Sequence, residues 1–187
     1  MYFRTICDWD EGFWYALEGV YKQAFSYGRK NRHVVKKLLN QGQGCLHVGI
    51  EGSDVVAMAL TADLGGLNAL LIDYFGVRKD QRSQGIGTQF VGYIKNWAMD
   101  TGYSGIVMEV VSDFGKTADH QNVRRVRFCQ ECGFQITDYL HQYKGVYELY
   151  RAGYLNLTLE SNLPTTGEVL FRHIIQYHAM AWGWTYP

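Results

Sequence analysis

Proline, excess charge and long apolar runs are all scarce in this chain of 187 residues. Pro164 and Pro187 are its only prolines, so no proline-rich linker divides it. Basic and acidic residues both number 18, and this balance gives no electrostatic reason to bind nucleic acid or anionic membranes. No run approaches the ~20 apolar residues of a transmembrane helix, and the N-terminus lacks the features of a signal peptide. We expect one domain over 1–187, with no membrane or nucleic-acid partner.

Cysteine is also sparse, with four residues at Cys7, Cys45, Cys129 and Cys132. Because no secretion signal is visible, we expect four reduced thiols and a cytoplasmic protein. Cys129 and Cys132 form a Cys-x-x-Cys pair, but no second ligand pair accompanies it. A zinc site is therefore not expected, and no other metal site is predicted.

The sequence does contain apolar periodicity of both kinds. Alternating or continuous apolar runs predict strands, and apolar residues at helical spacing predict helices. The predicted strands are 2–7, 45–50, 54–62, 67–77, 104–111, 134–140 and 145–151, and the predicted helices are 9–25, 29–41, 85–99 and 120–131. Early strands joined by short turns, then strand, helix, strand, helix and strand, indicate a mixed α/β fold with helices on the faces of the sheet.

The tail, about 152–187, follows a predicted core of about 1–151. It contains a strand-like segment and a last helix, for which Thr165 and Glu168 have the spacing of a capping box. This helix is more apolar than a surface helix needs. We expect it to pack on its own domain, or alternatively to form a homodimer contact or a lid over an acceptor pocket.

The stretch from Val77 to Thr88 carries the most chemical information. An apolar strand ends at Val77, a polar loop follows, and Gly85 and Gly87 open a helix. Glycine lets the backbone approach a ligand closely, and the free amides and dipole of a first helical turn suit a phosphate group. Gly87 is not followed by the lysine of a Walker A loop, and Phe90 replaces the third glycine of a dinucleotide fingerprint.

The remaining pattern, Arg-x-x-Gly-x-Gly at Arg82, Gly85 and Gly87, resembles the coenzyme A loop of the GCN5-related N-acetyltransferase (GNAT) superfamily. A second segment, which opens with Asn122 and closes with Gly-Phe, resembles the other recurring element of that superfamily. The resemblance covers about 68–150. It implies a GNAT-like central mixed, mostly antiparallel sheet of about six to seven strands, flanked by helices on both faces.

The same resemblance implies a site for acetyl-CoA as cosubstrate. The end of the fourth strand would pair its backbone with the pantetheine arm, the next loop would hold the pyrophosphate, and the later asparagine would bind the coenzyme from the other side. In that order, these residues are Phe75, Gly76 and Val77; Arg82, Ser83, Gln84, Gly85, Ile86, Gly87 and Thr88; and Asn122. The implied reaction is acetyl transfer to a primary amine by direct attack in a ternary complex.

Amine acetylation requires deprotonation of an ammonium and a proton for the departing thiolate. Asp73 and Glu109 lie in the two strands expected to line the cleft, and they are alternative candidates for the base. At the position where the superfamily often has a tyrosine that protonates the thiolate, this chain has Cys129, whose side chain is shorter. Cys129, Tyr143 and Tyr147 are candidates for the acid, and orientation of the substrates could suffice without one.

Three functions stay open. The first is acetylation of a small-molecule or peptide amine. The second is a non-catalytic acyl-CoA-binding sensor or interaction module on the same fold, for which the replacement of tyrosine by Cys129 is the motive. The third is acetylation of a protein N-terminus or lysine. No motif in the chain identifies the acceptor.

Overall fold

The structure is a computed structural model that describes residues 1–25, 30–115 and 119–182. Its strands are β1 (Tyr2–Ile6), β2 (Gly44–Glu51), β3 (Asp54–Leu64), β4 (Ala69–Val77), β5 (Gly105–Val111), β6 (Gln135–Ile136) and β7 (Tyr150–Asn156). Its helices are α1 (Glu11–Ala24), α2 (Arg32–Asn40), the short 3-10 helix η1 (Lys79–Gln81), α3 (Ile86–Asp100), α4 (His120–Glu131) and α5 (Gly167–Trp182).

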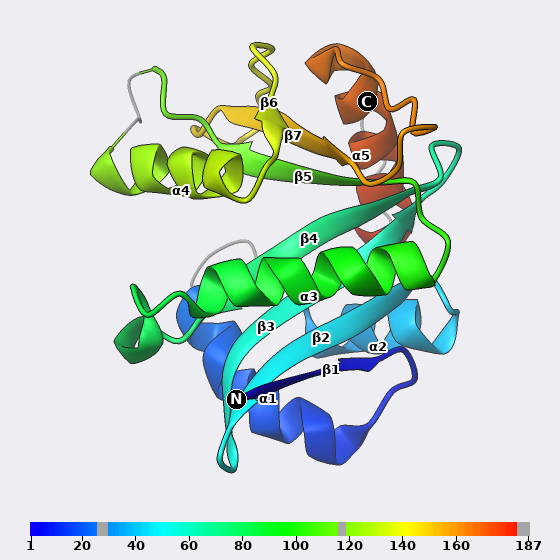
Figure 1. The fold of residues 1–187 in the computed structure, drawn as a ribbon. Coiled ribbons are helices and arrows are strands. Elements are labelled where there is room, and N and C mark those ends of the chain that lie inside the picture. Colours follow the sequence, from blue (N-terminus) through cyan, green and yellow to red (C-terminus); the bar gives the residue numbers. More distant parts are fainter. Residues whose placement is uncertain (26–29, 116–118, 183–187) are drawn as a thin grey trace.

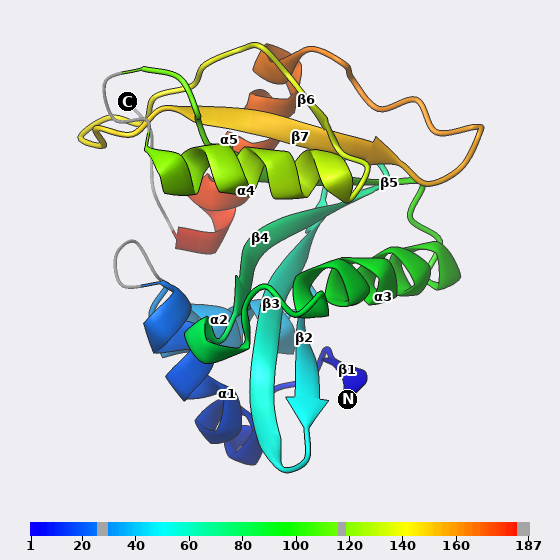
Figure 2. The ribbon, with the colours of Figure 1, turned by 60° about the vertical axis from the view of Figure 1, so that its left-hand side comes forward.

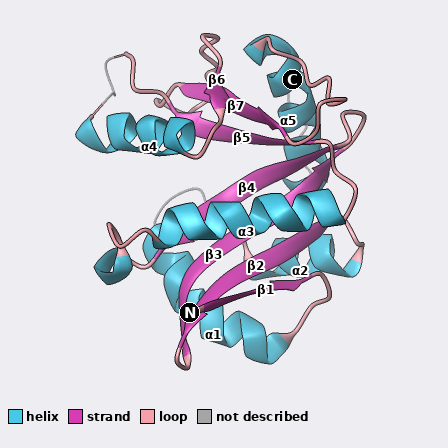
Figure 3. Ribbon diagram, viewed as in Figure 1, coloured by secondary structure: helices cyan, strands magenta, loops and turns pink. Residues whose placement is uncertain are grey.

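The strands form one seven-stranded sheet in the order β1-β2-β3-β4-β5-β7-β6 (Figures 1 and 3). The β4–β5 pair is parallel, and the other neighbouring strands are antiparallel. Helices α1, α2 and α5 cover one face, and α3 and α4 cover the other (Figure 2). These observations confirm the expected mixed α/β fold with a mostly antiparallel sheet.

Each face of the sheet carries its own apolar core. On the first face, Leu17 of α1 and Leu38 of α2 are fully buried, and Phe171 brings α5 into the same cluster. On the second face, Phe90 and Ile94 of α3 pack in a cluster with α4. Burial of one such side chain contributes about 1.5–3 kcal/mol. Because the central strands are covered on both faces, they are apolar without alternation, as strand β3 illustrates.

The last two strands differ from their predicted ranges. The strand expected at 134–140 is reduced to β6, and the strand expected at 145–151 is β7, which begins at Tyr150. Pairing with β5 sets this position, since Val111 lies opposite Tyr150 and Gly105 lies opposite Asn156. The apolar pattern alone does not contain this register. Strand β7 therefore crosses the boundary that we expected near 151.

The start of α5 also differs from the prediction. The Leu170 amide donates to the Thr166 carbonyl at 3.2 Å, which makes Thr166, rather than Thr165, the residue at the helix cap. Glu168, the other member of the expected capping box, accepts a hydrogen bond from Arg172 at 3.2 Å. The helix contacts β7, β3 and α2 of the same chain.

The prediction of four reduced cysteines is wrong for two of them. Cys7 and Cys45 form a disulfide, although they lie 38 positions apart in the sequence. The antiparallel β1–β2 register pairs Ile6 with Leu46, so the next residues face each other across the two strands. Cys129 and Cys132 are free and buried. Because stable disulfides are rare in cytosolic proteins, the cysteines no longer support the expected cytoplasmic location.

Gly76 allows α1 to pack directly on β4, because a Cβ there would lie 2.6 Å from the Ala24 Cβ. We expect Gly76→Ala to lower the free energy of unfolding by about 1–3 kcal/mol, as overpacked core sites do. The matched control is Gly92→Ala inside α3, where a Cβ would have no neighbour within 4 Å. Helix propensity favours that change by roughly 0.8–1 kcal/mol. Urea unfolding monitored by circular dichroism compares the two variants, and equal effects would contradict the close approach.

Candidate active site

Strands β4 and β5 pair along only part of their lengths. Their parallel register begins at Ala69 opposite Gly105 and ends at Ile72 opposite Met108. Beyond this point the two strands diverge (Figure 2). The edge of β4 from Asp73 to Val77 therefore faces a split in the sheet, and its backbone groups on that side have no partner strand among the described residues.

A β-bulge in β4 begins where the split begins. In the antiparallel ladder with β3, Leu60 pairs with Tyr74 and Thr61 pairs with Ile72, so Asp73 is the extra residue. The bulge interrupts the alternation of side chains. Ile72 packs on the α3–α4 face, whereas Asp73 and Tyr74 both lie on the face covered by α1, α2 and α5.

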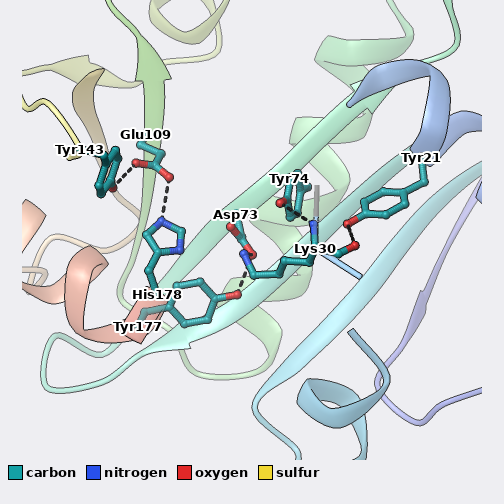
Figure 4. A network of polar contacts seen from close by, with 8 residues as sticks. All are labelled: Tyr21, Lys30, Asp73, Tyr74, Glu109, Tyr143, Tyr177 and His178. Atoms are coloured by element: carbon teal, nitrogen blue, oxygen red, sulfur yellow. Dashed lines mark hydrogen bonds and ion pairs between the residues drawn. The ribbon is translucent and has the colours of Figure 1, made fainter. Parts of the chain in front are cut away.

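Asp73 is the centre of a buried ion pair (Figure 4). Lys30 Nζ lies 2.6 Å from Asp73 Oδ2, and the two side chains are 0% and 2% exposed. The Tyr177 hydroxyl of α5 donates to the same carboxylate oxygen at 2.6 Å. Burial and then the charge of Asp73 raise the pKa of Tyr177 well above its usual value, so this hydroxyl stays protonated. The charge of Asp73 is therefore balanced within the protein.

The backbone of Lys30 is also held in place (Figure 4). Its amide donates to the Tyr74 hydroxyl at 3.0 Å, and its carbonyl accepts a hydrogen bond from the Tyr21 hydroxyl at 2.9 Å. The ammonium lies 4.8 Å from the centre of the Tyr74 ring and 5.4 Å from that of Tyr177. These rings favour a cation at this position.

Glu109 is the first residue of β5 beyond the paired segment, and it binds two side chains (Figure 4). The Tyr143 hydroxyl donates to Oε2 at 2.6 Å, and His178 Nε2 lies 2.9 Å from Oε1. Burial acts to raise the pKa of Glu109. The hydrogen bond from His178 and the charge that His178 carries when it is protonated, with the hydrogen bond from Tyr143 and the charge of Lys30, outweigh burial, and the net pKa lies below its usual value. Glu109 is therefore a carboxylate at neutral pH.

The loop before α3 presents free backbone amides on the other side of the split. Gly85, at the helix cap, has φ 78°, and Ser83 has φ 64°. The first helical hydrogen bond runs from the Gln89 amide to the Gly85 carbonyl, so the amides of the first turn have no helical partner. A Cβ at Gly85 would meet only Gln89, at 3.9 Å, and the space before it is open. Arg82 Nε donates to the Val77 carbonyl at 3.0 Å and ties the loop to β4.

The predicted coenzyme residues in this loop have different surroundings. Gly87 lies under the Phe128 ring, and a Cβ there would come within 3.2 Å of two ring atoms. Phe128 in turn packs on Phe75, with ring centres 5.7 Å apart, and Ile86 is buried in the same cluster. Exposed residues of the loop are Arg82, Ser83, Gln84, Gly85 and Thr88. Gly85 is thus required by its backbone conformation, and Gly87 by the packing of α3 on α4.

Asn122 lies in the first turn of α4 with its side chain buried. The Asp119 carboxylate caps this helix and accepts hydrogen bonds from the Gln121 and Asn122 amides, both at 2.8 Å. Helices α3 and α4 lie on either side of the split, and in Figure 2 the left-hand end of each helix is its N-terminus. Asn122 is therefore presented from the helix opposite the loop that precedes α3.

The three candidates for the acid are placed very differently. Cys129 is buried in the core beneath α4, where burial and then Cys132 raise its pKa to about 12. Transfer of its proton to a thiolate of ordinary pKa, ~8.5, is unfavourable. Tyr143 is buried and donates to Glu109, whereas Tyr147 is 86% exposed. Both tyrosines line a hollow of about 380 Å³ formed by residues 142–147.

The sequence-based reasoning missed Lys30, Tyr177 and His178 as parts of this site. Lys30 falls at the start of the helix predicted at 29–41, whereas α2 begins at Arg32, and no motif marked Lys30 as a site residue. The last helix was recognised as unusually apolar, but its polar side chains were not connected with Asp73 or Glu109. The connection is made by contacts between distant residues: Tyr177 lies 104 positions from Asp73, and His178 lies 69 positions from Glu109.

Within the described residues, no group of three or more His, Cys, Asp or Glu side chains is arranged to hold a metal ion. No described helix has the length and apolar character needed to cross a bilayer.

Comparison with solved structures reveals several of similar fold. A GNAT-family protein from Bacteroides thetaiotaomicron has a TM-score of 0.73 at 14% identity, covering 99% of this chain and 100% of that one. An aminoglycoside 6'-N-acetyltransferase complexed with coenzyme A has a TM-score of 0.69 at 13% identity, covering 87% and 100%. A Salmonella typhimurium protein with acetyl-CoA has a TM-score of 0.62 at 14% identity, covering 88% and 99%.

No curated protein sequence matches the chain significantly. At the low identities of the solved structures, the likeness to them shows the fold alone. The family model described as the acetyltransferase (GNAT) family matches residues 3–134, which is well over half of the chain. The protein therefore belongs to the GNAT family of acetyltransferases.

Proposed function

We propose that this protein transfers an acetyl group from acetyl-CoA to a primary amine of a small molecule or peptide, by direct attack in a ternary complex. The observation that carries the proposal is the split between β4 and β5. A loop with free amides lies on one side of it, and a buried network of charged side chains lies on the other.

On the coenzyme side, the residues fit a diphosphate and an extended arm. The amides from Arg82 to Thr88 and the positive end of the α3 dipole suit the diphosphate, in the open space before Gly85. The free edge of β4 at Phe75, Gly76 and Val77 suits the amides of the pantetheine arm. Asn122 would bind from the opposite helix. Bound there, acetyl-CoA supplies an activated acetyl thioester.

On the acceptor side, the charges favour a cation. Asp73 and Glu109 carry two negative charges, Lys30 carries one positive charge, and a neutral His178 leaves one negative charge in excess. An acceptor ammonium would balance that charge. The tyrosine rings around the network suit an apolar or aromatic body on the amine. Because Lys30 already balances Asp73, proton transfer is expected at the Glu109 end.

The arrangement favours an enzyme over a sensor, because a sensor has no need of a buried charge network opposite the coenzyme. Isothermal titration should show acetyl-CoA binding in both cases. Release of the coenzyme A thiol should rise with an amine panel that contains an aminoglycoside, a polyamine, an aromatic amine and a peptide with a free N-terminus. Binding without release for any amine would support the sensor instead.

Initial rates test the ternary complex. When both substrates are varied, direct attack predicts intersecting lines in a double-reciprocal plot, whereas an acetylated enzyme intermediate predicts parallel lines. Stimulation by the peptide alone would direct attention to a protein N-terminus or lysine as the acceptor.

Cys129→Ala should leave the rate of acetyl transfer within about threefold of wild type, since a thiol with a pKa of about 12 is a poor proton donor for a departing thiolate. Loss of the buried sulfur should lower the melting temperature slightly. The thiol-release assay at saturating amine provides the measurement. A loss of two orders of magnitude in a folded variant would assign the acid role to Cys129.

A further inference from the structure

We propose that His178 is the general base that deprotonates the acceptor ammonium, and that Glu109 is the residue that positions it. This inference rests on the proposed acetyl transfer and adds a residue to it. His178 lies on α5, which is outside residues 3–134 that match the family model. The family match therefore does not provide this assignment.

The contact with Glu109 fixes the tautomer of His178. A carboxylate can only accept hydrogen bonds, so the His178 Nε2 that lies 2.9 Å from Glu109 Oε1 carries the hydrogen. In the neutral ring, the lone pair is then on Nδ1. The other carboxylate oxygen, Oε2, accepts from the Tyr143 hydroxyl at 2.6 Å. Glu109 is thus held at both oxygens, and it orients the ring.

The second ring nitrogen is an acceptor in need of a donor. His178 is 8% exposed, and its Nδ1 is buried with no hydrogen-bond partner among the described residues. Buried polar atoms in folded proteins nearly always have a partner, so an unsatisfied one calls for an explanation. In Figure 4, this nitrogen faces the side on which Asp73 and Lys30 lie, between the diverging strands. An acceptor ammonium placed in the split supplies the missing donor.

The two carboxylates, Asp73 and Glu109, are less suited to deprotonating the acceptor. Asp73 is paired with the Lys30 ammonium and also accepts from Tyr177. Glu109 uses both oxygens for Tyr143 and His178. A neutral imidazole beside a carboxylate is a suitable base near neutral pH, because the carboxylate stabilises the imidazolium that forms.

The step balances within the ternary complex. An N–H bond of the acceptor ammonium breaks, and its proton forms a new bond to His178 Nδ1. The electron pair left on the amine nitrogen forms the bond to the acetyl carbonyl carbon, and the carbon–sulfur bond of the thioester breaks. The electron pair of that bond leaves on the thiolate, which takes up the second N–H proton as the neutral amide forms. The proton on His178 passes to water, so the net products are the amide, the coenzyme A thiol and one proton.

The pH dependence follows from the same assignment. A protonated imidazole cannot accept the ammonium proton, so kcat/KM should fall as the pH falls. The titratable or charged groups around His178 are Glu109 of β5, Asp73 of β4, Lys30, His141 and Tyr143 of the loops, and Tyr177 of α5.

His178→Gln tests the inference, because the glutamine amide can still donate to Glu109 but has no basic nitrogen. We expect kcat/KM for benzylamine, or for whichever panel amine is the best substrate, to fall about 100-fold or more at neutral pH. The affinity for acetyl-CoA should stay within about twofold. An amine of low basicity, such as trifluoroethylamine, is already deprotonated at neutral pH, so its rate should fall far less.

Two variants serve as controls. His173→Gln alters another histidine of α5, one that contacts the Gly65 carbonyl at 3.1 Å, and it should not change the rate. Glu109→Gln should shift the acid side of the pH profile to lower pH, since the imidazolium loses its charged partner. A merely structural role for Glu109 would lower the rate without that shift.

The outcomes separate the two proposals. If His178→Gln binds acetyl-CoA normally and keeps its rate, or loses equal activity with both kinds of amine, His178 is not the base and the proposed function stands. If the wild-type protein neither binds acetyl-CoA nor releases thiol with any amine, the proposed function itself fails. Should His178→Gln not fold, His178→Ala with added imidazole replaces it, and rescue that saturates with imidazole is the expected result. Absence of rescue in a folded protein that binds acetyl-CoA overturns the inference.

Discussion

Gly85→Glu should weaken acetyl-CoA binding by about 100-fold or more, which corresponds to ~3 kcal/mol, while the protein stays folded. The new carboxylate would enter the open space before the first turn of α3 and repel the diphosphate expected there. The left-handed conformation of Gly85, at φ 78°, adds about 1–2 kcal/mol of backbone strain for an ordinary side chain. Isothermal titration measures the affinity, and thermal melting measures the stability.

The matched control for this prediction is Gly85→Asn. Asparagine tolerates the left-handed conformation better than other residues and carries no charge. We expect it to fold with near wild-type stability and to retain acetyl-CoA affinity within about tenfold. If Gly85→Glu folds and binds acetyl-CoA as the wild type does, the coenzyme site lies elsewhere. If both variants lose binding equally, shape rather than charge dominates at this position.

Lys30→Met should lower the free energy of unfolding by about 3–5 kcal/mol, because it leaves the buried carboxylate of Asp73 without its cation. The hydrogen bond from Tyr177 remains, but it cannot balance a full negative charge at a side chain that is 2% exposed. Urea unfolding monitored by intrinsic fluorescence provides the measurement.

Two further variants show whether the loss comes from the buried ion pair. Lys22 pairs with Glu18 at 3.1 Å on the surface of α1, and Lys22→Met should cost about 0.5 kcal/mol or less. The double variant Lys30→Met with Asp73→Asn removes both charges and should recover part of the loss. Equal effects for Lys30→Met and Lys22→Met would mean that the Lys30–Asp73 pair is accessible to water in solution.

The buried network also bears on the acceptor. Lys30 and His178 approach the split from different parts of the chain, one before α2 and one on α5. Their partners Asp73 and Glu109 are the first residues beyond the paired segment of β4 and β5. The point at which β4 and β5 stop pairing is thus the point at which Asp73 and Glu109 lie, on the sheet face opposite α3 and α4.

The features that the sequence predicted well are local ones. Apolar periodicity located the helices and the early strands, because a helix or strand that buries one face must repeat its apolar residues at a fixed interval. The glycine at position 85 indicated a special turn before a helix, and its φ of 78° confirms that only a few residue types fit there. Gly87 was also predicted to let the backbone approach the coenzyme. Its contact with the Phe128 ring shows in addition a packing role, which the motif does not indicate.

The features that only the tertiary structure decided depend on contacts between distant residues. The bulge at Asp73 and the start of β7 at Tyr150 follow from pairing with neighbouring strands, and the Cys7–Cys45 disulfide follows from the β1–β2 register. Likewise, Tyr177 and His178 reach the site through contacts that span 104 and 69 positions of the chain, respectively. Local periodicity contains no information on such pairings. The sequence by itself determined the helices and early strands, the family resemblance and the loop that we propose to bind the diphosphate, whereas packing determined which charged groups lie together in the split.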